Sequence, residues 1–360
     1  MKPNQSLNIG RGFVAKNRSL LAAMTNKQSH DDGALSPAEI NWLVRRAKGG
    51  FAITTTAAAN VTEHGRGWEG EMGVWGDHQL PGLTKMAEKL NLEETISLVQ
   101  LFHGGMRAPR AINGVRPISA SENTEPGMNG EYTRAMSTQE VKNMIQSFTD
   151  AAIRCEKAGF HGVELHGAHS YLICQFLGAK TNRRTDDYGG DIEGRSRFLL
   201  ELIDSIRSAT GDKFLIAVRI SPIIEKAGIY LKDSLTLAKL LCQSEIDMLH
   251  ISCWDVFEDV GDGNDESLTR RFRNVLPKDF PLVSTGAIWT TQDAQWLMNE
   301  GADIVGVARV GIAHPDWPMG LNDENFCPAK PPFTEDYLRS VELSDVFVEY
   351  MKRWKNFVVQ

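Results

Sequence analysis

Two histidines and a tyrosine lie close together in the sequence where an apolar run ends. The segment Gly162–His166 reads as a short buried strand, and His169 and Tyr171 follow it within five residues. Three hydrogen-bonding side chains are therefore presented where a strand meets a loop. In a barrel of alternating strands and helices, the groups that carry the chemistry lie at this end of the strands. The segment is thus the first candidate for an active site.

The same segment offers a second chemistry, which is metal binding. Glu164 and His166 are two residues apart, so on a strand their side chains share one face. With His169 they make a set of oxygen and nitrogen ligands of the kind that zinc uses. No further cluster of histidine and aspartate follows the other expected strands to complete such a site. A metal-dependent barrel hydrolase built on Glu164, His166 and His169 is therefore the alternative function, and under the main interpretation no metal is expected.

The elements that must position these groups alternate along the chain. Short β-branched or aliphatic runs are followed by longer amphipathic runs, which is typical of βα units around a parallel sheet. The expected strands are Ser19–Ala23, Gly50–Thr56, Ile96–Phe102, Gly162–His166, Phe214–Ile220, Asp247–Ile251, Pro281–Ser284 and Asp303–Val307. The expected helices are Ser36–Lys48, Pro81–Leu92, Ser137–Ala158, Ile192–Ala209, Ser234–Cys242, Glu266–Val275, Thr290–Asn299 and Glu335–Trp354.

Eight such units predict an α/β fold, a closed (β/α)8 barrel (TIM barrel) that spans residues 1–360 as one domain. No GxGxxG turn follows the first strand, which disfavours an open dinucleotide-binding sheet. Residues 104–136, between the third strand and its helix, are rich in glycine, proline, asparagine and glutamate. Because a loop of this length inside a compact domain is usually functional, we expect a lid-like insertion over the barrel mouth.

Residues at the ends of the other strands fit the needs of a flavin. Gln100 lies near the end of the third strand, and its amide suits the carbonyls of a buried isoalloxazine ring. Arg219 lies near the end of the fifth strand, and a fixed positive charge near the ring atom N1 stabilises the reduced, anionic flavin. Backbone N–H groups and an arginine follow strands seven and eight, where barrels bind phosphate. These residues are Gly286, Ala287, Ala308 and Arg309.

Over nearly the whole chain these residues resemble the old yellow enzyme family of NADH:flavin oxidoreductases, which are FMN-dependent ene reductases. The resemblance extends from Lys16-Asn17-Arg18 through Gln100-Leu101-Phe102-His103 to Pro315-Asp316-Trp317-Pro318. It implies noncovalent FMN, with a phosphate site at Gly286, Ala287, Ala308 and Arg309. It further implies a ring site at Ala23, Met24, Thr25, Ala58, Gln100 and Arg219. Ala308 stands where the family usually has a glycine, and Lys27 stands where one branch has a substrate-facing tyrosine.

The resemblance also implies a reaction. NADH or NADPH reduces the flavin and leaves, and an α,β-unsaturated carbonyl or nitro compound takes its place. His166 and His169 then hold the electron-withdrawing group while flavin N5 passes a hydride to the β-carbon. Tyr171 protonates the α-carbon. Phe102 and Lys27 are the further residues expected to face this substrate.

Composition and charge limit the partners of the chain. There are 39 basic and 46 acidic residues, giving a net charge of −7, which disfavours nucleic acid and anionic membranes. The five cysteines lack the spacing of a disulfide framework or of an iron–sulfur cluster. No run of about 18 apolar residues predicts a membrane span, and the first residues lack the pattern of a signal peptide. We therefore expect a cytoplasmic enzyme that acts on a small electrophilic alkene, and a homo-oligomer is compatible with these features.

Overall fold

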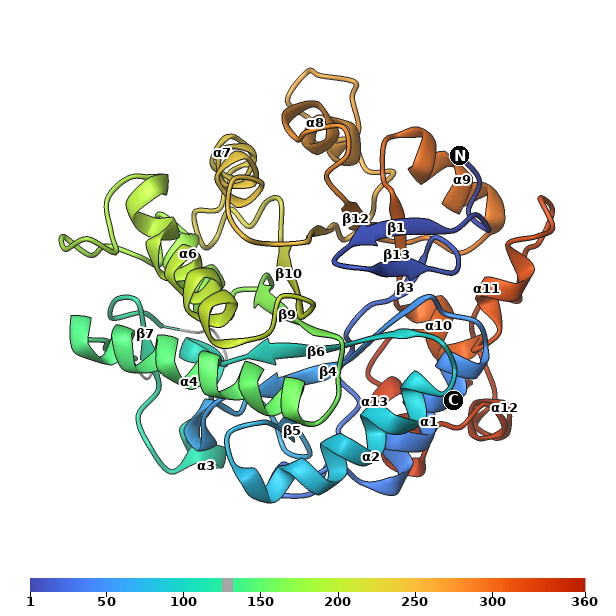
Figure 1. The fold of residues 1–360 in the computed structure, drawn as a ribbon, viewed down its shortest axis with the longest axis horizontal. Helices are drawn as coiled ribbons and strands as arrows, with labels where there is room; N and C mark the ends of the chain where they lie inside the picture. The colour runs from blue at the N-terminus through green and yellow to red at the C-terminus, as the bar shows by residue number, and fades with distance from the viewer. Residues whose placement is uncertain (125–131, 360) are drawn as a thin grey trace.

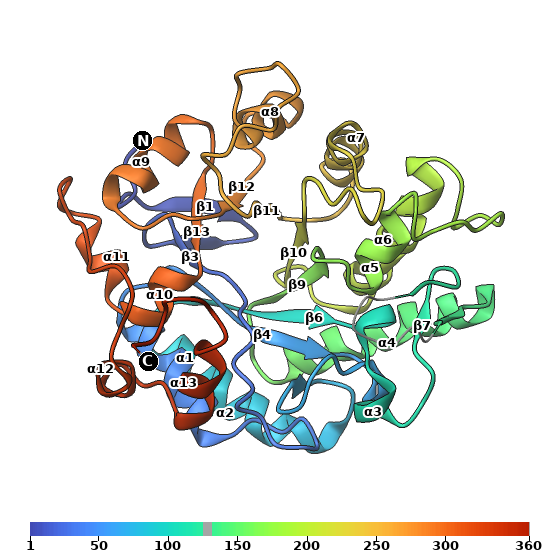
Figure 2. The same cartoon turned by 180° about the vertical axis from the view of Figure 1, so that it is seen from behind.

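The centre of the molecule is a closed barrel of eight parallel strands (Figures 1 and 2). The computed structural model describes residues 1–124 and 132–359. Strand β13 pairs with β3, and β3 pairs in turn with β4, so the sheet has no free edge within the barrel. The barrel strands are β3 (Ser19–Leu21), β4 (Ile53–Asn60), β6 (Ile96–Phe102), β9 (Gly162–Gly167), β10 (Leu215–Ile220), β11 (Met248–Ser252), β12 (Leu282–Thr285) and β13 (Ile304–Val307). The predicted (β/α)8 barrel is confirmed.

Amphipathic helices surround the barrel in Figure 1. They are α1 (Pro37–Lys48), α2 (Leu80–Asn91), α4 (Thr138–Lys157), α6 (Ile192–Ala209), α7 (Leu231–Leu241), α8 (Leu268–Val275) and α9 (Thr291–Asn299). Helix α4 begins with a capping box, in which Ser137 accepts a hydrogen bond from the N–H of Glu140 and the Glu140 carboxylate accepts one from the N–H of Ser137. Within the described residues, no helix combines the length and the apolar character that crossing a membrane requires.

Several short elements complete the fold. The strands outside the barrel are β1 (Leu7–Gly10), β2 (Phe13–Ala15), β5 (Met72–Gly73), β7 (Ile118–Ser119) and β8 (Arg134–Ala135). The short helices are η1 (Glu63–Gly65), η2 (Asp77–Gln79), η3 (Gly105–Arg107), α3 (Arg110–Asn113), α5 (Leu172–Leu177), α10 (Arg309–Ala313), α11 (Trp317–Gly320), α12 (Glu335–Ser340) and α13 (Asp345–Met351). Helix α5, which carries the chain away from the histidine segment, is labelled in Figure 2.

Two predicted elements differ most from the structure in their bounds. The single helix expected over Glu335–Trp354 is two helices, α12 and α13, because Glu342 takes a left-handed conformation (φ 69°) and Ser344 caps a new helix. The strand expected at Gly50–Thr56 begins at Ile53 and continues to Asn60. All eight residues of β4 are buried, and burial rather than alanine's helix preference decides their conformation.

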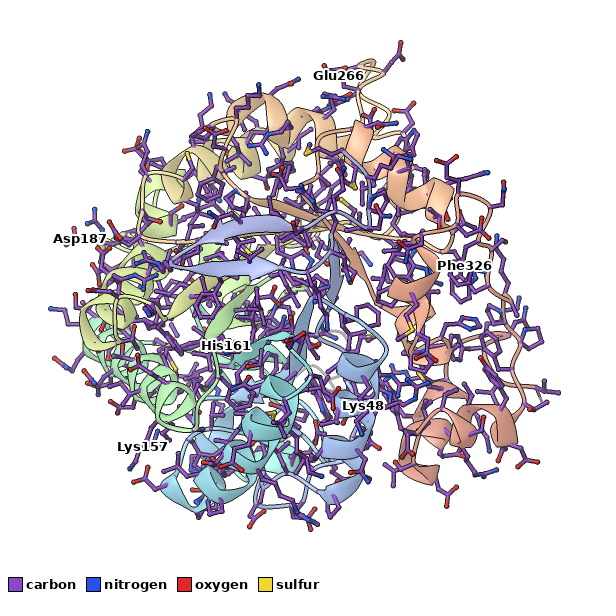
Figure 3. The ribbon with its side chains drawn as sticks, turned by 45° about the vertical axis from the view of Figure 1, so that its right-hand side comes forward. Lys48, Lys157, His161, Asp187, Glu266 and Phe326 are labelled. Carbon is purple, nitrogen blue, oxygen red and sulfur yellow. The ribbon has the colours of Figure 1, made fainter. Side chains whose placement is uncertain are left out.

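The hairpin of β1 and β2 closes the amino-terminal end of the barrel. Its Ile9 and Ala15 join the apolar cluster inside the barrel, which includes Leu98 and Met248. The ring of Phe13 in the hairpin meets His161 with a centroid distance of 5.0 Å. Figure 3 labels His161 at this end of the barrel. The interior is therefore filled at one end, and the site must lie at the other.

The insertion expected at residues 104–136 follows β6, and its residues 125–131 lie outside the described part. The described part is fastened to the residues that follow the histidine segment. Gln175 of α5 accepts hydrogen bonds from the N–H of Met106 (3.0 Å) and the hydroxyl of Ser119 (2.8 Å). Asn123 donates to the carbonyl of Thr181 (2.8 Å). This portion of the insertion thus packs against α5 and the residues that follow it.

Candidate active site

Strand register brings the predicted site residues to one end of the barrel. Gln100 of β6 pairs with Glu164 of β9, and Arg219 of β10 pairs with His166 on one side and His250 on the other. All of these side chains are buried. Because the strands are parallel, their carboxyl ends meet at a single edge, as in other barrel enzymes.

The histidine pair is set by a tight turn after β9. The imidazole rings of His166 and His169 lie at right angles with centroids 5.1 Å apart. His169 and Ser170 both take left-handed backbone conformations (φ 57° and 61°), which are uncommon for residues other than glycine. The hydroxyl of Ser221 accepts a hydrogen bond from the N–H of His169 (3.1 Å) and holds the turn. Such local strain is typical of functional sites.

Both histidines are neutral at pH 7. Burial, together with the positive charge of Arg219, holds the pKa of His166 well below its ordinary value. His169 as a residue is exposed. The protein atoms packed around its ring nevertheless desolvate the ring, and with the charges of Arg219 and Arg107 they hold its pKa well below the ordinary value. Each ring therefore carries a single N–H.

Hydrogen bonds decide which nitrogen holds that proton. The hydroxyl of Ser252 accepts from Arg219 Nη2 (3.0 Å), which leaves its own proton available for His169 Nε2 (2.9 Å), and we assign the donor role there to Ser252. His166 Nδ1 accepts from the N–H of Ala168 (3.4 Å). The proton of His169 then resides on Nδ1 and that of His166 on Nε2. The two rings offer one N–H donor each.

Tyr171 stands at the start of α5 within a cluster of rings. Its ring centroid is 4.4 Å from that of Phe102, 5.0 Å from that of His166 and 6.3 Å from that of Trp68. The guanidinium of Arg107 lies over the same ring at 4.7 Å and donates to the carbonyl of His169 (2.8 Å). Phe102 is fully buried, and its ring meets that of Tyr171 at 78° in an edge contact.

Arg219 is a buried cation at the base of the site. Its Nη1 donates to the carbonyl of Ala23 (3.3 Å) and its Nη2 to Ser252, while Nε is buried without a partner among the described residues. Met24 and Thr25 follow Ala23 and are partly buried. An unpaired buried donor suits a ligand that carries oxygen or nitrogen acceptors.

Two other predicted residues lie on neighbouring elements. Ala58 pairs with Gln100 beyond a register shift in β4, so this short side chain lies beside the expected ring contact. Lys27 lies 5.9 Å from the ring centroid of Tyr350 in α13, and within the described structure it makes no ring contact with Tyr171. The structure brings Ala58 to the predicted cluster and turns Lys27 toward the carboxyl-terminal helix.

A phosphate group fits the ends of β12 and β13. Within the described residues, the backbone N–H groups of Gly286, Ala287, Ala308 and Arg309 have no hydrogen-bond acceptor. Gly286 has φ 158°, and a Cβ there would lie 2.8 Å from the carbonyl of Cys253. Arg309 is exposed and has no polar partner in the described structure. Free N–H groups beside an arginine are what a phosphate requires.

The sequence analysis missed several residues of the site, of which three join or pack on its central groups. His250 lies within β11, and its Nδ1 bonds Glu164 (2.6 Å). Ser252 joins Arg219 to His169, and Trp68 packs on the ring cluster. A polar residue inside an apolar strand was the one available signal for His250, whereas Trp68 comes from a loop without a pattern.

The alternative metal site is not formed. The carboxylate of Glu164 accepts hydrogen bonds from Gln100 Nε2 (2.7 Å) and from His250. Among residues 1–124 and 132–359, no group of three histidine, cysteine, aspartate or glutamate side chains is arranged to hold a metal ion. Both carboxylate oxygens of Glu164 are thus engaged by Gln100 and His250.

Fold and site together define a barrel oxidoreductase that takes FMN as cofactor and NADH or NADPH as reductant. The chain belongs to the NADH:flavin oxidoreductase / NADH oxidase family, whose model matches residues 5–325. The family expected from the sequence is therefore confirmed.

Three comparisons give the degree of likeness. The chain is 33% identical over 323 residues to the probable NADH-dependent flavin oxidoreductase YqiG of Bacillus subtilis (strain 168), covering 87% of this chain and 85% of that protein. It is 32% identical over 324 residues to the NADH:fumarate oxidoreductase of Klebsiella pneumoniae (strain 342), covering 87% of this chain and 35% of that longer protein. The old yellow enzyme homologue from Zymomonas mobilis shares its fold, with a TM-score of 0.82 at 24% identity over 97% of this chain and 99% of that one.

If Arg309 meets the phosphate of FMN, its removal should weaken cofactor binding. We expect Arg309→Gln to bind FMN roughly 10- to 100-fold more weakly, because a hydrogen bond to a charged group contributes about 1.5–3 kcal/mol. The dissociation constant can be measured by the fluorescence of FMN added to apoprotein. Arg353→Gln, which changes an exposed arginine near the carboxyl terminus, is the control. Equal retention of FMN by both variants would show that Arg309 does not meet the phosphate.

Proposed function

We propose that this enzyme reduces the C=C bond of α,β-unsaturated carbonyl or nitro compounds. The observation that supports the proposal is the juxtaposition of two neutral imidazoles and a phenol, with His166 5.1 Å from His169 and 5.0 Å from Tyr171 between ring centroids. Two N–H donors suit a single oxygen that gains negative charge during reaction. A nearby phenol suits a carbon that must receive a proton.

Each group has one task in this proposal. Bound FMN, once reduced by NADH or NADPH, supplies a hydride from N5 to the β-carbon. His166 and His169 hold the oxygen of the electron-withdrawing group, so the charge drawn from the alkene collects beside their N–H groups. Tyr171 gives its proton to the α-carbon. Phe102 keeps the ring of Tyr171 in place, and Lys27, on the loop after Met24 and Thr25, is the further residue assigned to the substrate side.

We extend the proposal to the whole chain. Residues 1–360 form one FMN-binding domain, and the described part of the insertion, residues 104–124 and 132–136, covers the barrel mouth as a lid. The position of Arg107 over Tyr171 and the hydrogen bonds of Gln175 to the insertion support this role. All five cysteines are free thiols, which suits a reducing compartment, and we place the enzyme in the cytoplasm.

A two-stage experiment tests the proposed reaction. The purified enzyme is first reduced without oxygen by one equivalent of NADPH or NADH, which bleaches the visible absorbance of the flavin. A cyclic enone is then added, and the saturated ketone serves as a control. We expect the enone to restore the flavin absorbance and to be recovered as the ketone. Restoration by a quinone or by oxygen, and none by enones or nitroalkenes, would refute alkene reduction.

The charge of Arg219 should set the ease of flavin reduction. We expect Arg219→Met to lower the reduction potential of the flavin by about 30 mV or more, which corresponds to a tenfold loss in the relative stability of the reduced form. The reason is that a buried cation favours the anionic reduced ring. The potential is measured by equilibration with a reference dye. An unchanged potential in a folded, FMN-loaded variant would place the arginine away from the ring.

A further inference from the structure

A buried chain of hydrogen bonds crosses the barrel beneath the predicted ring contact. Gln100 Nε2 donates to Glu164 Oε1 (2.7 Å), and Glu164 Oε2 meets His250 Nδ1 (2.6 Å). His250 Nε2 meets the hydroxyl of Thr285 (2.7 Å). These side chains come from β6, β9, β11 and β12, and each is at most 5% exposed. Four buried polar side chains in one hydrogen-bonded series need a reason beyond packing. Apolar residues would fill the same space without the free-energy cost of removing polar groups from water.

The protons along this chain can be assigned. Burial opposes the charge of Glu164, yet His250 and Arg219 hold its pKa below the ordinary value, so the carboxylate is ionised. Burial lowers the pKa of His250, which leaves its imidazole neutral at pH 7. His250 Nδ1 therefore donates to Glu164, and Nε2 accepts from the hydroxyl of Thr285.

This assignment has two effects at the other end of the chain. The ionised carboxylate of Glu164 can accept hydrogen bonds but cannot donate them. The amide of Gln100 must therefore turn its nitrogen toward Glu164. A flipped amide would bring its oxygen against a carboxylate oxygen, and two acceptors repel each other. The second effect is electrostatic. Among the described residues Arg219 has no carboxylate in hydrogen-bond contact, and the negative charge that acts on it is that of Glu164.

We propose that Glu164, itself fixed by His250 and Thr285, is a positioning residue for FMN: it holds Gln100 in one orientation and offsets the charge of Arg219, and so sets the reduction potential of the flavin. The inference rests on the proposed function only in its assignment of Gln100 and Arg219 to the ring. It does not depend on alkene reduction. The charges that face Glu164 are those of Arg219 and, when protonated, His250; the two site histidines are neutral.

Glu164→Gln separates charge from shape. The variant keeps the size of the side chain and leaves Arg219 without its opposing charge. We expect the reduction potential to rise, with the reduced form favoured at least tenfold more than in the unaltered enzyme, equivalent to about 30 mV for two electrons. Asp303→Asn is the matched control, because Asp303 is a partly buried carboxylate paired with Arg273 (2.9 Å) at the opposite end of the barrel. The reduction potential of the flavin should not change in Asp303→Asn.

Glu164→Asp tests the positioning role. The charge stays, but the shorter side chain draws back from Gln100, so we expect at least tenfold weaker FMN binding by fluorescence titration and a potential close to that of the unaltered enzyme. Unfolding temperature and circular dichroism report whether each variant is folded. An unchanged or lower potential in Glu164→Gln, or unchanged FMN binding in folded Glu164→Asp, overturns the proposal. If Glu164→Gln cannot hold FMN, the Glu164→Asp result decides alone. Enone turnover by the unaltered enzyme reports separately on the proposed function.

Discussion

Replacement of Tyr171 by phenylalanine should slow alkene reduction by a factor of roughly 10² or more while flavin reduction by NAD(P)H stays nearly intact. The first effect follows from the loss of a positioned acid, whose usual contribution is in this range. The second follows because hydride transfer to the flavin does not use the phenol. The ring itself remains, so its contacts with Phe102 and Arg107 should persist.

Stopped-flow measurement of the two half-reactions checks this prediction. Oxygen or quinone turnover, which needs no carbon protonation, should survive in Tyr171→Phe. Tyr188→Phe is the control, since Tyr188 is a buried tyrosine whose hydroxyl donates to Glu201 (2.7 Å) away from the ring cluster. Equal slowing of both half-reactions, or of neither, would mean that Tyr171 only packs and that the proton has another source.

Loss of one imidazole from the histidine pair should slow alkene reduction as much as the loss of the Tyr171 hydroxyl, or more. We expect His166→Ala to reduce the rate of alkene reduction by roughly 10²–10³, the range for removal of one donor from a developing negative charge. It should also abolish the long-wavelength charge-transfer band that a phenol gives when it binds as a phenolate over oxidised flavin. His169→Asn keeps a donor and should retain part of both signals.

The charge-transfer band can be followed by visible absorbance while phenol is added, and repeating the titration at several pH values gives the pH dependence of phenol affinity. Because the pKa of each histidine lies well below its ordinary value, both stay neutral as the pH falls through 6.5, the ordinary pKa. Phenol affinity should therefore show no step near that pH and should follow only the ionisation of the phenol. His161→Gln changes a histidine at the far end of the barrel and should leave the band unaltered. Phenol binding that survives His166→Ala would contradict the assignment.

Much of the barrel could be predicted because each strand is a short apolar run followed by an amphipathic helix. The prediction for β6 has the bounds that the structure shows, Ile96–Phe102. Prediction failed where tertiary burial overrides local preference, as in the alanines that end β4. It failed again between α12 and α13, where one left-handed residue, Glu342, decides the break. Neither cause leaves a periodic pattern in the sequence.

The site was predictable as far as it lies at strand ends. His166, Arg219 and Gln100 come to one edge because parallel strands share their direction. The partners that fix protonation were not predictable, because a hydrogen bond such as that between His250 and Glu164 joins residues 86 positions apart across the barrel. Sequence spacing predicts on which face of a strand a side chain lies. It does not predict which side chain from a distant strand will contact it on that face.

The hairpin that fills the amino-terminal end of the barrel has a kinetic consequence. Since Ile9 and Ala15 pack into the interior, the described residues close this end of the barrel and leave small molecules the opposite mouth. Reductant and oxidant would then enter by the same mouth, and where they compete for one position over the flavin they would bind in turn. The rate in a cell would depend on the ratio of nicotinamide to alkene as well as on their amounts, and a surplus of alkene would inhibit its own reduction by occupying the oxidised enzyme.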